Sequence, residues 1–153
     1  MKNKSIVMRD IMATALTTLE ESAFLIDAAL ILRRTGFRHL PIVSGERLVG
    51  LISDRDVHRF APSLLTDITP EEYNRVFEST PINRVMTREV VTVTPDTSVE
   101  EAVALLHGKK LGCLPVVEGE KLVGMVTVTD MLEVLHRILL PSPEAPLAGS
   151  ESS

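Results

Sequence analysis

The sequence predicts an α+β fold made of two similar β-α-β-β-α repeats. The main observation is an internal duplication: a shift of 74 residues aligns residues 8–60 with residues 82–134 without a gap. Thirteen of the 53 aligned positions are identical, whereas average composition would give about three matches. In both copies, short β-branched segments alternate with segments whose apolar residues recur at helical intervals. Two copies of one unit can pack on each other and create sites between them.

The composition is that of a globular protein, with 44% hydrophobic and 24% charged residues in a chain of 153. Each repeat alone would have a marginal core, so we expect the two repeats to share one. The chain has no Trp and only 3% aromatic residues. The core must therefore be built from aliphatic side chains and Met, and an aromatic stacking surface is not favoured.

Charge and cysteine content argue against several classes of function. A formal net charge of −5 argues against binding to a nucleic-acid backbone, which favours a basic face. The single cysteine, Cys113, excludes an intramolecular disulfide and a multi-cysteine metal site. Apolar runs stay well below the roughly 18 residues of a membrane span. We expect no signal peptide and a cytoplasmic location.

The first repeat is expected to span residues 7–60. Ala23 stands where the second repeat has Thr97, so we predict that Ser22 caps the first helix. The segments LPIV and RLVGLIS predict a β-hairpin with its turn at Gly45, and a second helix begins near Asp56.

Residues 61–81 form the predicted connector. Thr69, Pro70 and Glu72 are a capping signal for a short helix that ends near Ser79. At the C-terminal end, residues 141–153 are rich in Pro, Ser, Gly and Ala, and they predict a flexible tail.

The second repeat is expected to span residues 82–137. The segment VVTVTP predicts a short strand stopped by Pro95, and Thr97 and Glu100 have the spacing of a capping box. The segments CLPVV and KLVGMVTV predict a hairpin with its turn at Gly119. The segment TDMLEVLHRILL predicts a second helix.

The same polar pattern ends the second hairpin strand of each repeat. The sequences GLISDRD and GMVTVTD share a Gly, two apolar residues, a hydroxyl residue, two variable residues and an Asp. The strands end at Ser53 and Thr127, and the helices begin near Asp56 and Asp130, which leaves backbone N–H groups where an anion can be held. Each carboxylate can also accept two hydrogen bonds from a vicinal diol.

A purely structural interpretation of this pattern stays open. Ser, Thr and Asp are common at helix starts, and these residues could serve only as caps, a contribution of about 1 kcal/mol each. Occurrence in both copies does not distinguish capping from ligand binding.

The two LP[IV]V segments, the LVG strands and the G-x-x-[ST]-x-x-D ends together resemble a tandem pair of CBS domains, the Bateman module, over about residues 7–137. The length, the SDRD sequence and the connector resemble stand-alone bacterial CBS-pair proteins of the acetoin-utilisation accessory type. The resemblance implies pseudo-twofold symmetry, two sheets that pack together and a homodimer. It also implies two clefts that hold adenosine-containing ligands such as AMP, ADP, ATP, S-adenosylmethionine or NAD.

The resemblance also assigns site residues, because each cleft combines the hydroxyl-and-Asp end of one repeat with the first strand and the residues before LP of the other. One cleft would contain Thr127, Thr129, Asp130, Thr14, Leu16, Arg38 and His39. The other would contain Ser53, Arg55, Asp56, Arg88, Val90, Gly112 and Cys113.

The two predicted clefts differ in charge. Arg38 and His39 offer charge-assisted bonds to phosphate, and the residues at the matching places of the second repeat do not. The Asp130 cleft is therefore expected to take the more phosphorylated ligand, although Arg55 and Arg88 could compensate in the Asp56 cleft.

We therefore predict a regulatory module, and not an enzyme, that senses AMP, ADP or ATP and changes its own packing or that of a protein partner. It would require no cofactor and would bind neither nucleic acid nor a membrane. Three alternatives stay open. One is a structural or oligomerisation protein with degenerate clefts. The second is a module that responds to metal ions through acidic residues, although no metal site is predicted. The third is an enzyme of unknown type, which turnover of a nucleotide would support.

Overall fold

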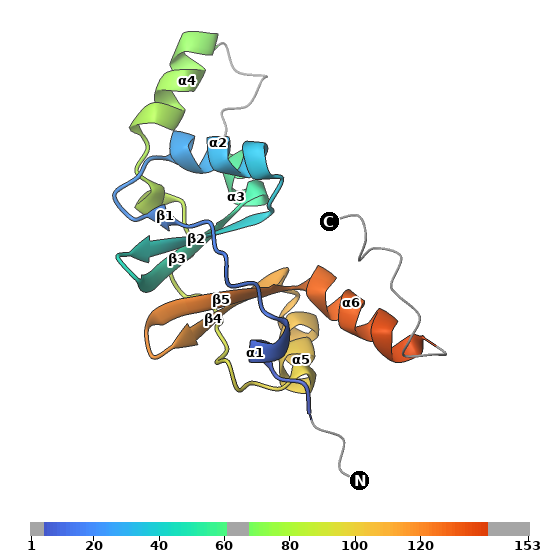
Figure 1. Cartoon of the computed structure of the whole chain (residues 1–153). Helices are drawn as coiled ribbons and strands as arrows, with labels where there is room; N and C mark the ends of the chain where they lie inside the picture. Colours follow the sequence, from blue (N-terminus) through green and yellow to red (C-terminus); the bar gives the residue numbers. More distant parts are fainter. Residues whose placement is uncertain (1–4, 61–67, 141–153) are drawn as a thin grey trace.

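The computed structural model describes residues 5–60 and 68–140. Two halves are stacked on each other, the first built around β2 and β3 and the second around β4 and β5 (Figure 1). The elements in chain order are α1 (Met8–Ile11), β1 (Leu19–Glu20), α2 (Leu25–Thr35), β2 (His39–Ser44), β3 (Arg47–Ser53), α3 (Asp54–Phe60), α4 (Pro70–Ser79), the 3-10 helix η1 (Ile82–Arg84), α5 (Val99–Lys109), β4 (Cys113–Glu118), β5 (Lys121–Thr127) and α6 (Val128–Leu139). The predicted α+β fold is confirmed. The predicted tail and residues 61–67 of the connector lie outside the described residues.

Each half contains the β-hairpin that the sequence predicts. The turns lie at Gly45 and Gly119, whose φ angles of 64° and 62° are left-handed, a conformation that costs glycine little. In the first hairpin His39 pairs with Ser53, and the second hairpin has the same register. In both hairpins, therefore, the start of the first strand lies beside the end of the second strand.

The two hairpins join into one five-stranded sheet in the order β1-β2-β3-β5-β4. This differs from the two separate sheets that the resemblance implied. β3 and β5 are antiparallel and meet at their turn ends, where Arg47 pairs with Lys121. There the Leu48 amide donates to the Glu120 carbonyl oxygen at 3.0 Å. A short stretch of backbone pairing therefore connects the sheets of the two halves.

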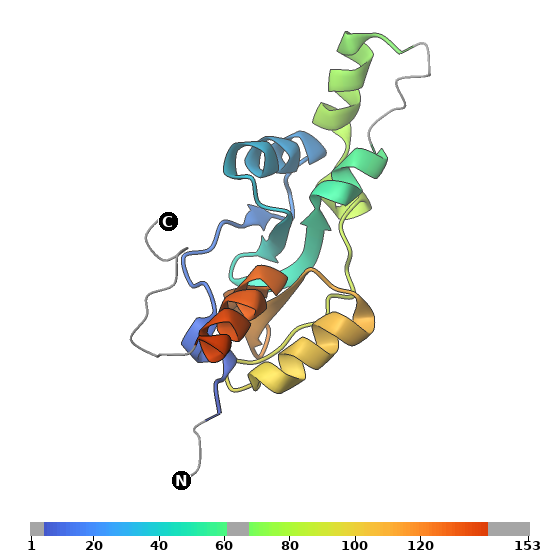
Figure 2. The same cartoon turned by 90° about the vertical axis from the view of Figure 1, so that its right-hand side faces the viewer.

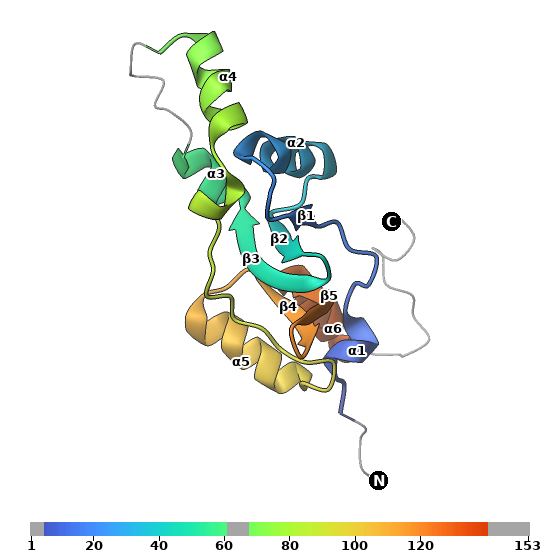
Figure 3. The same cartoon turned by 90° about the vertical axis from the view of Figure 1, so that its left-hand side faces the viewer.

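The first segment of each repeat is bound to the opposite half. Ala13, from the first repeat, pairs with Met125 on β5 through two backbone hydrogen bonds of 2.9 and 3.0 Å. Thr87, from the second repeat, pairs in the same way with Leu51 on β3, at 2.8 and 2.9 Å. Accordingly, α1 lies in the second half beside α5 (Figures 1 and 3). The repeats of the sequence are thus not the halves of the structure.

A methionine next to each of these bridges packs on a glycine of the opposite hairpin. A Cβ atom added to Gly124 would lie 2.5 Å from Met12 Sδ, and one added to Gly50 would lie 2.5 Å from Met86 Sδ. The Gly50 position is also close to backbone, because its added Cβ would lie 3.1 Å from the Thr87 carbonyl oxygen. The glycines of the two LVG segments therefore allow the crossing segments to approach the strands.

Three clusters of buried residues form the core. The first half and the second half have one cluster each, and Met8 of the first repeat belongs to the cluster of the second half. Ile82 and Met86 of the second repeat belong to the cluster of the first half. The third cluster lies between the hairpins and consists of Val43, Cys113, Val117, Leu122 and Met125. The expected shared core therefore exists as a distinct layer between the halves.

The connector helix α4 confirms its prediction. Thr69 Oγ1 accepts a hydrogen bond from the Glu72 amide at 3.1 Å, and the Glu72 carboxylate accepts one from the Thr69 amide at 3.2 Å. Phe77 is buried in the cluster of the first half. The helix is thus both capped and packed, as an ordered connector requires.

The predicted cap of α5 is wrong by one residue. Ser98 Oγ accepts from the Glu101 amide at 3.2 Å and is the N-cap. The Thr97 hydroxyl instead accepts a hydrogen bond from the Thr94 amide at 3.0 Å. Thr97, which the capping-box spacing predicted as the cap, is therefore hydrogen-bonded in a turn just before the helix.

Two other local predictions are wrong. Ser22 does not cap α2, because the helix begins after Phe24, whose amide donates to the Asp27 carboxylate at 2.9 Å. The segment VVTVTP forms an isolated parallel bridge, Val93 with Val116, and no strand longer than that. This segment crosses between the halves, so only a short part of it stays beside β4.

We expect Gly50→Ala and Gly124→Ala to destabilise the protein by about 1–3 kcal/mol each, because the added methyl group overpacks the contact with the opposite methionine. Chemical denaturation monitored by circular dichroism measures this change.

Gly108→Ala is the matched control. Gly108 lies in α5 with no atom within 4 Å of an added Cβ, so this change should stabilise the protein by up to about 1 kcal/mol through helix propensity. A neutral effect of Gly50→Ala and Gly124→Ala would show that the close approach of the crossing segments is not a constraint.

Candidate functional site

A cleft of about 820 Å³ opens between the two halves beside the end of β3. Its walls come from the start of β2, the end of β3 with α3, the segment before residue 92 and the start of β4. Six of the seven residues predicted for the Asp56 cleft line it: Ser53, Arg55, Asp56, Val90, Gly112 and Cys113.

Capping hydrogen bonds hold Asp56 in place. Its Oδ2 atom accepts from the Ser53 amide at 2.9 Å, and Ser53 Oγ accepts from the Asp56 amide at 3.0 Å. The structural role that the sequence left open is therefore real. Among the described residues, the second carboxylate oxygen, Oδ1, makes no hydrogen bond. Capping thus occupies one oxygen and leaves the other for a ligand.

Asp130 has the same arrangement in the second half. Its Oδ2 atom accepts from the Thr127 amide at 2.8 Å and from the Thr127 hydroxyl at 3.1 Å. Thr127 Oγ1 in turn lies 3.3 Å from the Asp130 amide. The shared sequence pattern therefore has the same local structure in both repeats, and differences between the two sites must come from other residues.

The His39 ring crosses between the halves and lies against Gly112. A Cβ atom added to Gly112 would lie 2.5 Å from His39 Cε1, so the ring occupies the space of a side chain there. Partial burial of this ring lowers the pKa of His39, and the charges of Asp54 and Asp56 oppose that shift in part. The neutral form of the imidazole is therefore favoured in the folded protein.

Cations outnumber carboxylates around this cleft. The cationic residues are Arg38, Arg55, Arg59 and Lys110, and the acidic residues are Asp54, Asp56 and Glu89. Within residues 5–60 and 68–140, the salt bridges involve none of these four cations. The cleft therefore combines unneutralised positive charge with a carboxylate oxygen that is free to accept hydrogen bonds.

Arg38 and His39 line the cleft of Asp56, whereas the sequence interpretation assigned them to the cleft of Asp130. The hairpin register is the physical reason, since His39 pairs with Ser53 and the Asp54 amide donates to the Arg38 carbonyl oxygen at 2.9 Å. Counting residues outward from the turn places His39 within one residue of Ser53, and an irregularity in the register between Ile42 and Val43 shifts the final pairing by one residue. The grouping with Asp130 is thus corrected by local geometry.

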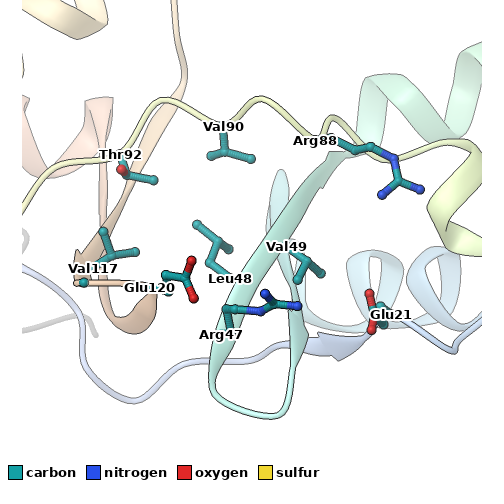
Figure 4. Close-up of a pocket in the computed structure, with 10 residues that line it drawn as sticks. Glu21, Arg47, Leu48, Val49, Arg88, Val90, Thr92, Val117 and Glu120 are labelled. Atoms are coloured by element: carbon teal, nitrogen blue, oxygen red, sulfur yellow. The ribbon is translucent and has the colours of Figure 1, made fainter.

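Arg88 lies in a separate hollow of about 440 Å³. Figure 4 shows Arg88 and Val90 on a segment that passes over β3, with Arg47 and Glu21 on the other side of the hollow. Val90 lines both this hollow and the Asp56 cleft, so the two spaces meet at the segment. The structure therefore places Arg88 outside the cleft for which it was predicted.

Asp130 lines a third hollow, of about 610 Å³, between α1 and α6. Its one cation, Arg137, is paired with Glu133 at 3.1 Å, and Asp10 adds another carboxylate. The residues predicted to join Asp130 there are not among those that line this hollow: Thr14, Leu16, Thr127, Thr129, Arg38 and His39. Leu16 instead packs against the cluster between the hairpins. This hollow is acidic and does not favour phosphate.

Cys113 is a core residue, as the sequence predicted. It is 4% exposed and belongs to the cluster between the hairpins. Burial raises the pKa of its thiol to about 12. The thiolate is therefore scarce at neutral pH, which argues against a nucleophilic cysteine.

Neither a metal centre nor a membrane helix is evident in the part of the chain that the structure describes. Residues 5–60 and 68–140 contain no group of three or more His, Cys, Asp or Glu side chains that could hold a metal ion. Within the same residues, no helix combines the length and the apolar character that crossing a membrane requires.

Comparison with known proteins agrees with the fold. The family model described as CBS domain matches residues 8–63 and 82–137. A crystal structure described as that of an acetoin utilization protein (AcuB) from Vibrio cholerae has a TM-score of 0.76 at 30% identity, covering 94% of this chain and 100% of that chain. A crystal structure of CBSX2 in complex with AMP has a TM-score of 0.71 at 25% identity, covering 86% of this chain and 97% of that chain. The CBS-pair protein CBSX2 from Arabidopsis thaliana has a TM-score of 0.72 at 27% identity, covering 88% and 97%.

Relatives in sequence include both small and large proteins. A CBS domain-containing protein of Dictyostelium discoideum is 28% identical over 140 residues, which are 90% of this chain and 97% of that protein. A homoserine O-acetyltransferase of Methanohalobium evestigatum is 28% identical over 129 residues, but the match spans only 24% of its length. For the A-adding tRNA nucleotidyltransferase of Geobacter sulfurreducens, the match spans 13%.

His39 should make the stability of the protein depend on pH. Its pKa is lowered in the folded state, so the unfolded chain takes up a proton first as the pH falls through the ordinary histidine value of about 6.5. The contribution of neutral His39 to the free energy of unfolding is therefore fully present above that pH and is lost below it. We expect the free energy of unfolding to fall less between pH 7.5 and pH 5.5 in His39→Gln than in the wild-type chain.

The exposed histidine of α5 provides the control, because His107→Gln changes the same side chain outside the cleft. Urea unfolding at several pH values compares the three proteins. Equal pH dependence in all three would show that the burial of His39 between the halves has no thermodynamic effect.

Proposed function

Since the chain belongs to the CBS domain family, we propose that it is a regulatory module that binds an adenosine-containing nucleotide of the AMP, ADP or ATP class in the cleft beside Asp56. A cytoplasmic location and the regulation of a protein partner are parts of the same proposal. The observation that carries it is the combination, in one cleft between the halves, of a free carboxylate oxygen and four cations.

The chemistry of the cleft fits the parts of a nucleotide. Asp56 Oδ1 can accept hydrogen bonds from ribose hydroxyl groups, and Arg38 and Arg55 can bind phosphate oxygens. Aliphatic residues such as Leu51 and Val90 line the same cleft and offer an apolar surface for the base. A cleft of about 820 Å³ is also within the usual range of ligand sites, about 300–1,000 Å³.

The charge distribution favours the Asp56 cleft for the more phosphorylated ligand. This reverses the preference that the sequence interpretation gave to the Asp130 cleft, because the positive charge of Arg38, on which that preference was partly based, lies beside Asp56. The hollow at Asp130 has one cation, and that cation is paired with a carboxylate. A ligand with several negative charges is therefore better stabilised beside Asp56.

A bound ligand would act by bridging the two halves. The first half supplies Asp56 and Arg38, and the second half supplies Gly112 and Lys110. A ligand can shift an arrangement of the halves only if it binds one arrangement more tightly. The similarity to CBSX2, a CBS-pair protein solved in complex with AMP, supports this class of ligand.

The proposed role does not include catalysis. The buried Cys113 is not an activated nucleophile, and the enzymes among the relatives match this chain over only 13–25% of their length. The alternative that the sequence leaves open, a structural module with degenerate clefts, draws support from the capping role of Asp56 and Asp130.

We further propose that two copies of the chain associate through α6. Met131 packs in the core cluster of the second half, and Val134 on the same helix is also buried. Exposed apolar side chains also lie along it at spacings of four, three and four residues: Val128, Leu132, Leu135 and Leu139, with exposed fractions of 41%, 59%, 49% and 70%. Helices with apolar residues on both faces are usually buried on both faces. α6 projects from the second half in Figure 1 and lies on the face toward the viewer in Figure 2. The exposed stripe can therefore meet the same stripe of a second copy.

Nucleotide binding is tested by calorimetry and thermal shift with AMP, ADP, ATP, NAD and S-adenosylmethionine. A ligand at a hundred times its dissociation constant should add about 2.7 kcal/mol of stability. Asp56→Asn should weaken ligand binding at the tightest site at least about tenfold, because the free carboxylate oxygen is replaced by an uncharged amide oxygen or by an NH2 group, which donates. The amide oxygen of Asn can still accept the capping hydrogen bond.

Asp130→Asn is the matched control, since it changes an equivalent capping carboxylate in the other half and should leave the tightest site unchanged. Equal losses in both variants would contradict the assignment to the Asp56 cleft. Absence of binding by any of these compounds would favour the structural alternative.

Association through α6 is tested by light scattering coupled to size exclusion. We expect the wild-type chain to be a dimer. The double variant that carries both Leu132→Glu and Leu135→Glu should be a folded monomer, because the two charges would be buried in the contact and oppose it. His136→Glu, on the same helix but outside the stripe, should remain dimeric. A monomeric wild-type chain would refute this interface.

A further inference from the structure

Lys110 has a backbone conformation that is unfavourable for lysine. It follows the last residue of α5 with φ 55° and ψ 48°, and it is the one residue other than glycine with a positive φ among those that the structure describes. The Leu111 amide donates to the Leu106 carbonyl oxygen at 2.9 Å, so the helix ends in a tight turn that requires this conformation. Glycine is the usual residue at such a position.

The first repeat has glycine at the equivalent place. Gly36 follows α2 with φ 74°, and its amide donates to the Leu32 carbonyl oxygen at 2.9 Å. The two repeats thus end their first long helix in the same way, but only the second repeat does so with a side chain. A left-handed residue with a Cβ atom is less stable than glycine there, so the lysine at residue 110 is not explained by the fold.

Helix stabilisation does not explain Lys110 either. A cation near the C-terminal end of a helix is favourable, but His107 and Lys109 already lie in the last turn of α5. All three side chains are exposed, and hydrophobic packing therefore gives no reason for a lysine at residue 110.

The position of Lys110 in the cleft offers a reason. Of the four cations that line the cleft, three belong to the first half, and Lys110 comes from the second half. Two residues further on, Gly112 has no side chain, and the His39 ring lies where its Cβ atom would be. Lys110 is therefore the cation of the second half that a ligand bound at Asp56 would meet.

We propose that Lys110 selects for a phosphorylated ligand by binding a phosphate oxygen of a nucleotide whose ribose is held by Asp56. This inference rests on the proposed function and adds a specificity-determining residue to it. The phosphate then links the second half to a ligand anchored in the first half. A neutral nucleoside makes no such contact and is bound less tightly.

The test compares AMP, ATP and adenosine by calorimetry, with Lys110→Met against Lys109→Met. The two changes remove the same charge from neighbouring residues, but Lys109 does not line the cleft. Lys110→Met should weaken the binding of AMP and of ATP about tenfold, which is the effect of losing one charge-assisted hydrogen bond. The affinity for adenosine should not change. Lys109→Met should change nucleotide affinity less than about twofold, and Lys110→Arg should retain most of it.

A second variant separates binding from folding. Lys110→Gly should raise the melting temperature of the ligand-free protein by about 2–4 °C, because the strain of the left-handed residue is removed. The same change should weaken the binding of AMP as much as Lys110→Met does. A lower melting temperature, or affinity for AMP equal to that of the wild type, would overturn the proposal.

The remaining outcomes are equally decisive. If Lys110→Met and Lys109→Met have the same affinity for AMP, or if Lys110→Met weakens adenosine as much as AMP, the role of Lys110 is refuted while nucleotide binding stands. If the wild-type chain binds adenosine as tightly as AMP, the selection for phosphate is refuted. If it binds none of the three compounds, the proposed function fails together with this inference.

Discussion

The structure depends on the reciprocal crossing of the two first segments. Ala13 pairs with β5 of the second half, and Thr87 pairs with β3 of the first half. Neither half is complete without the segment contributed by the other repeat, since Met8 and Met86 lie in the opposite cores. The crossing also builds the cleft, because the segment that follows Thr87 passes the end of β3 and forms one wall. Binding site and fold therefore share one set of long-range contacts.

The Asp at each helix start shows how one residue can serve structure and binding together. One oxygen of Asp56 satisfies the Ser53 amide, and the capping bonds fix the direction of the other oxygen. A carboxylate held in this way loses little freedom when a ligand arrives, which favours binding. Asp130 is fixed by the same bonds. Capping therefore does not argue against a ligand site, but it does not create one either.

The difference between the two sides of the module arises from side chains on nearly equivalent backbones. His39 occupies the cleft at a position where the second repeat has the small, buried Cys113. Lys110 stands where the first repeat has Gly36. Lys110, together with Arg38 where the second repeat has Gly112, gathers positive charge beside Asp56 and leaves Asp130 among carboxylates. Duplication thus provides the framework, and a few substitutions make the two sites unequal.

The sequence by itself determined what depends on neighbouring residues: the duplication, both hairpins with turns at Gly45 and Gly119, the capped connector helix and the burial of Cys113. It misjudged two helix starts, because Thr97 and Ser98 compete for one cap at α5 and because the Asp27 carboxylate accepts the Phe24 amide at the start of α2. It also grouped His39 with the wrong carboxylate, although counting from the turn places His39 within one residue of Ser53. Only the tertiary structure decided that the hairpins join into one sheet and which half each first segment enters. Such pairings bring together segments far apart in the chain, so packing between the halves selects them, and no local pattern of residues encodes that choice.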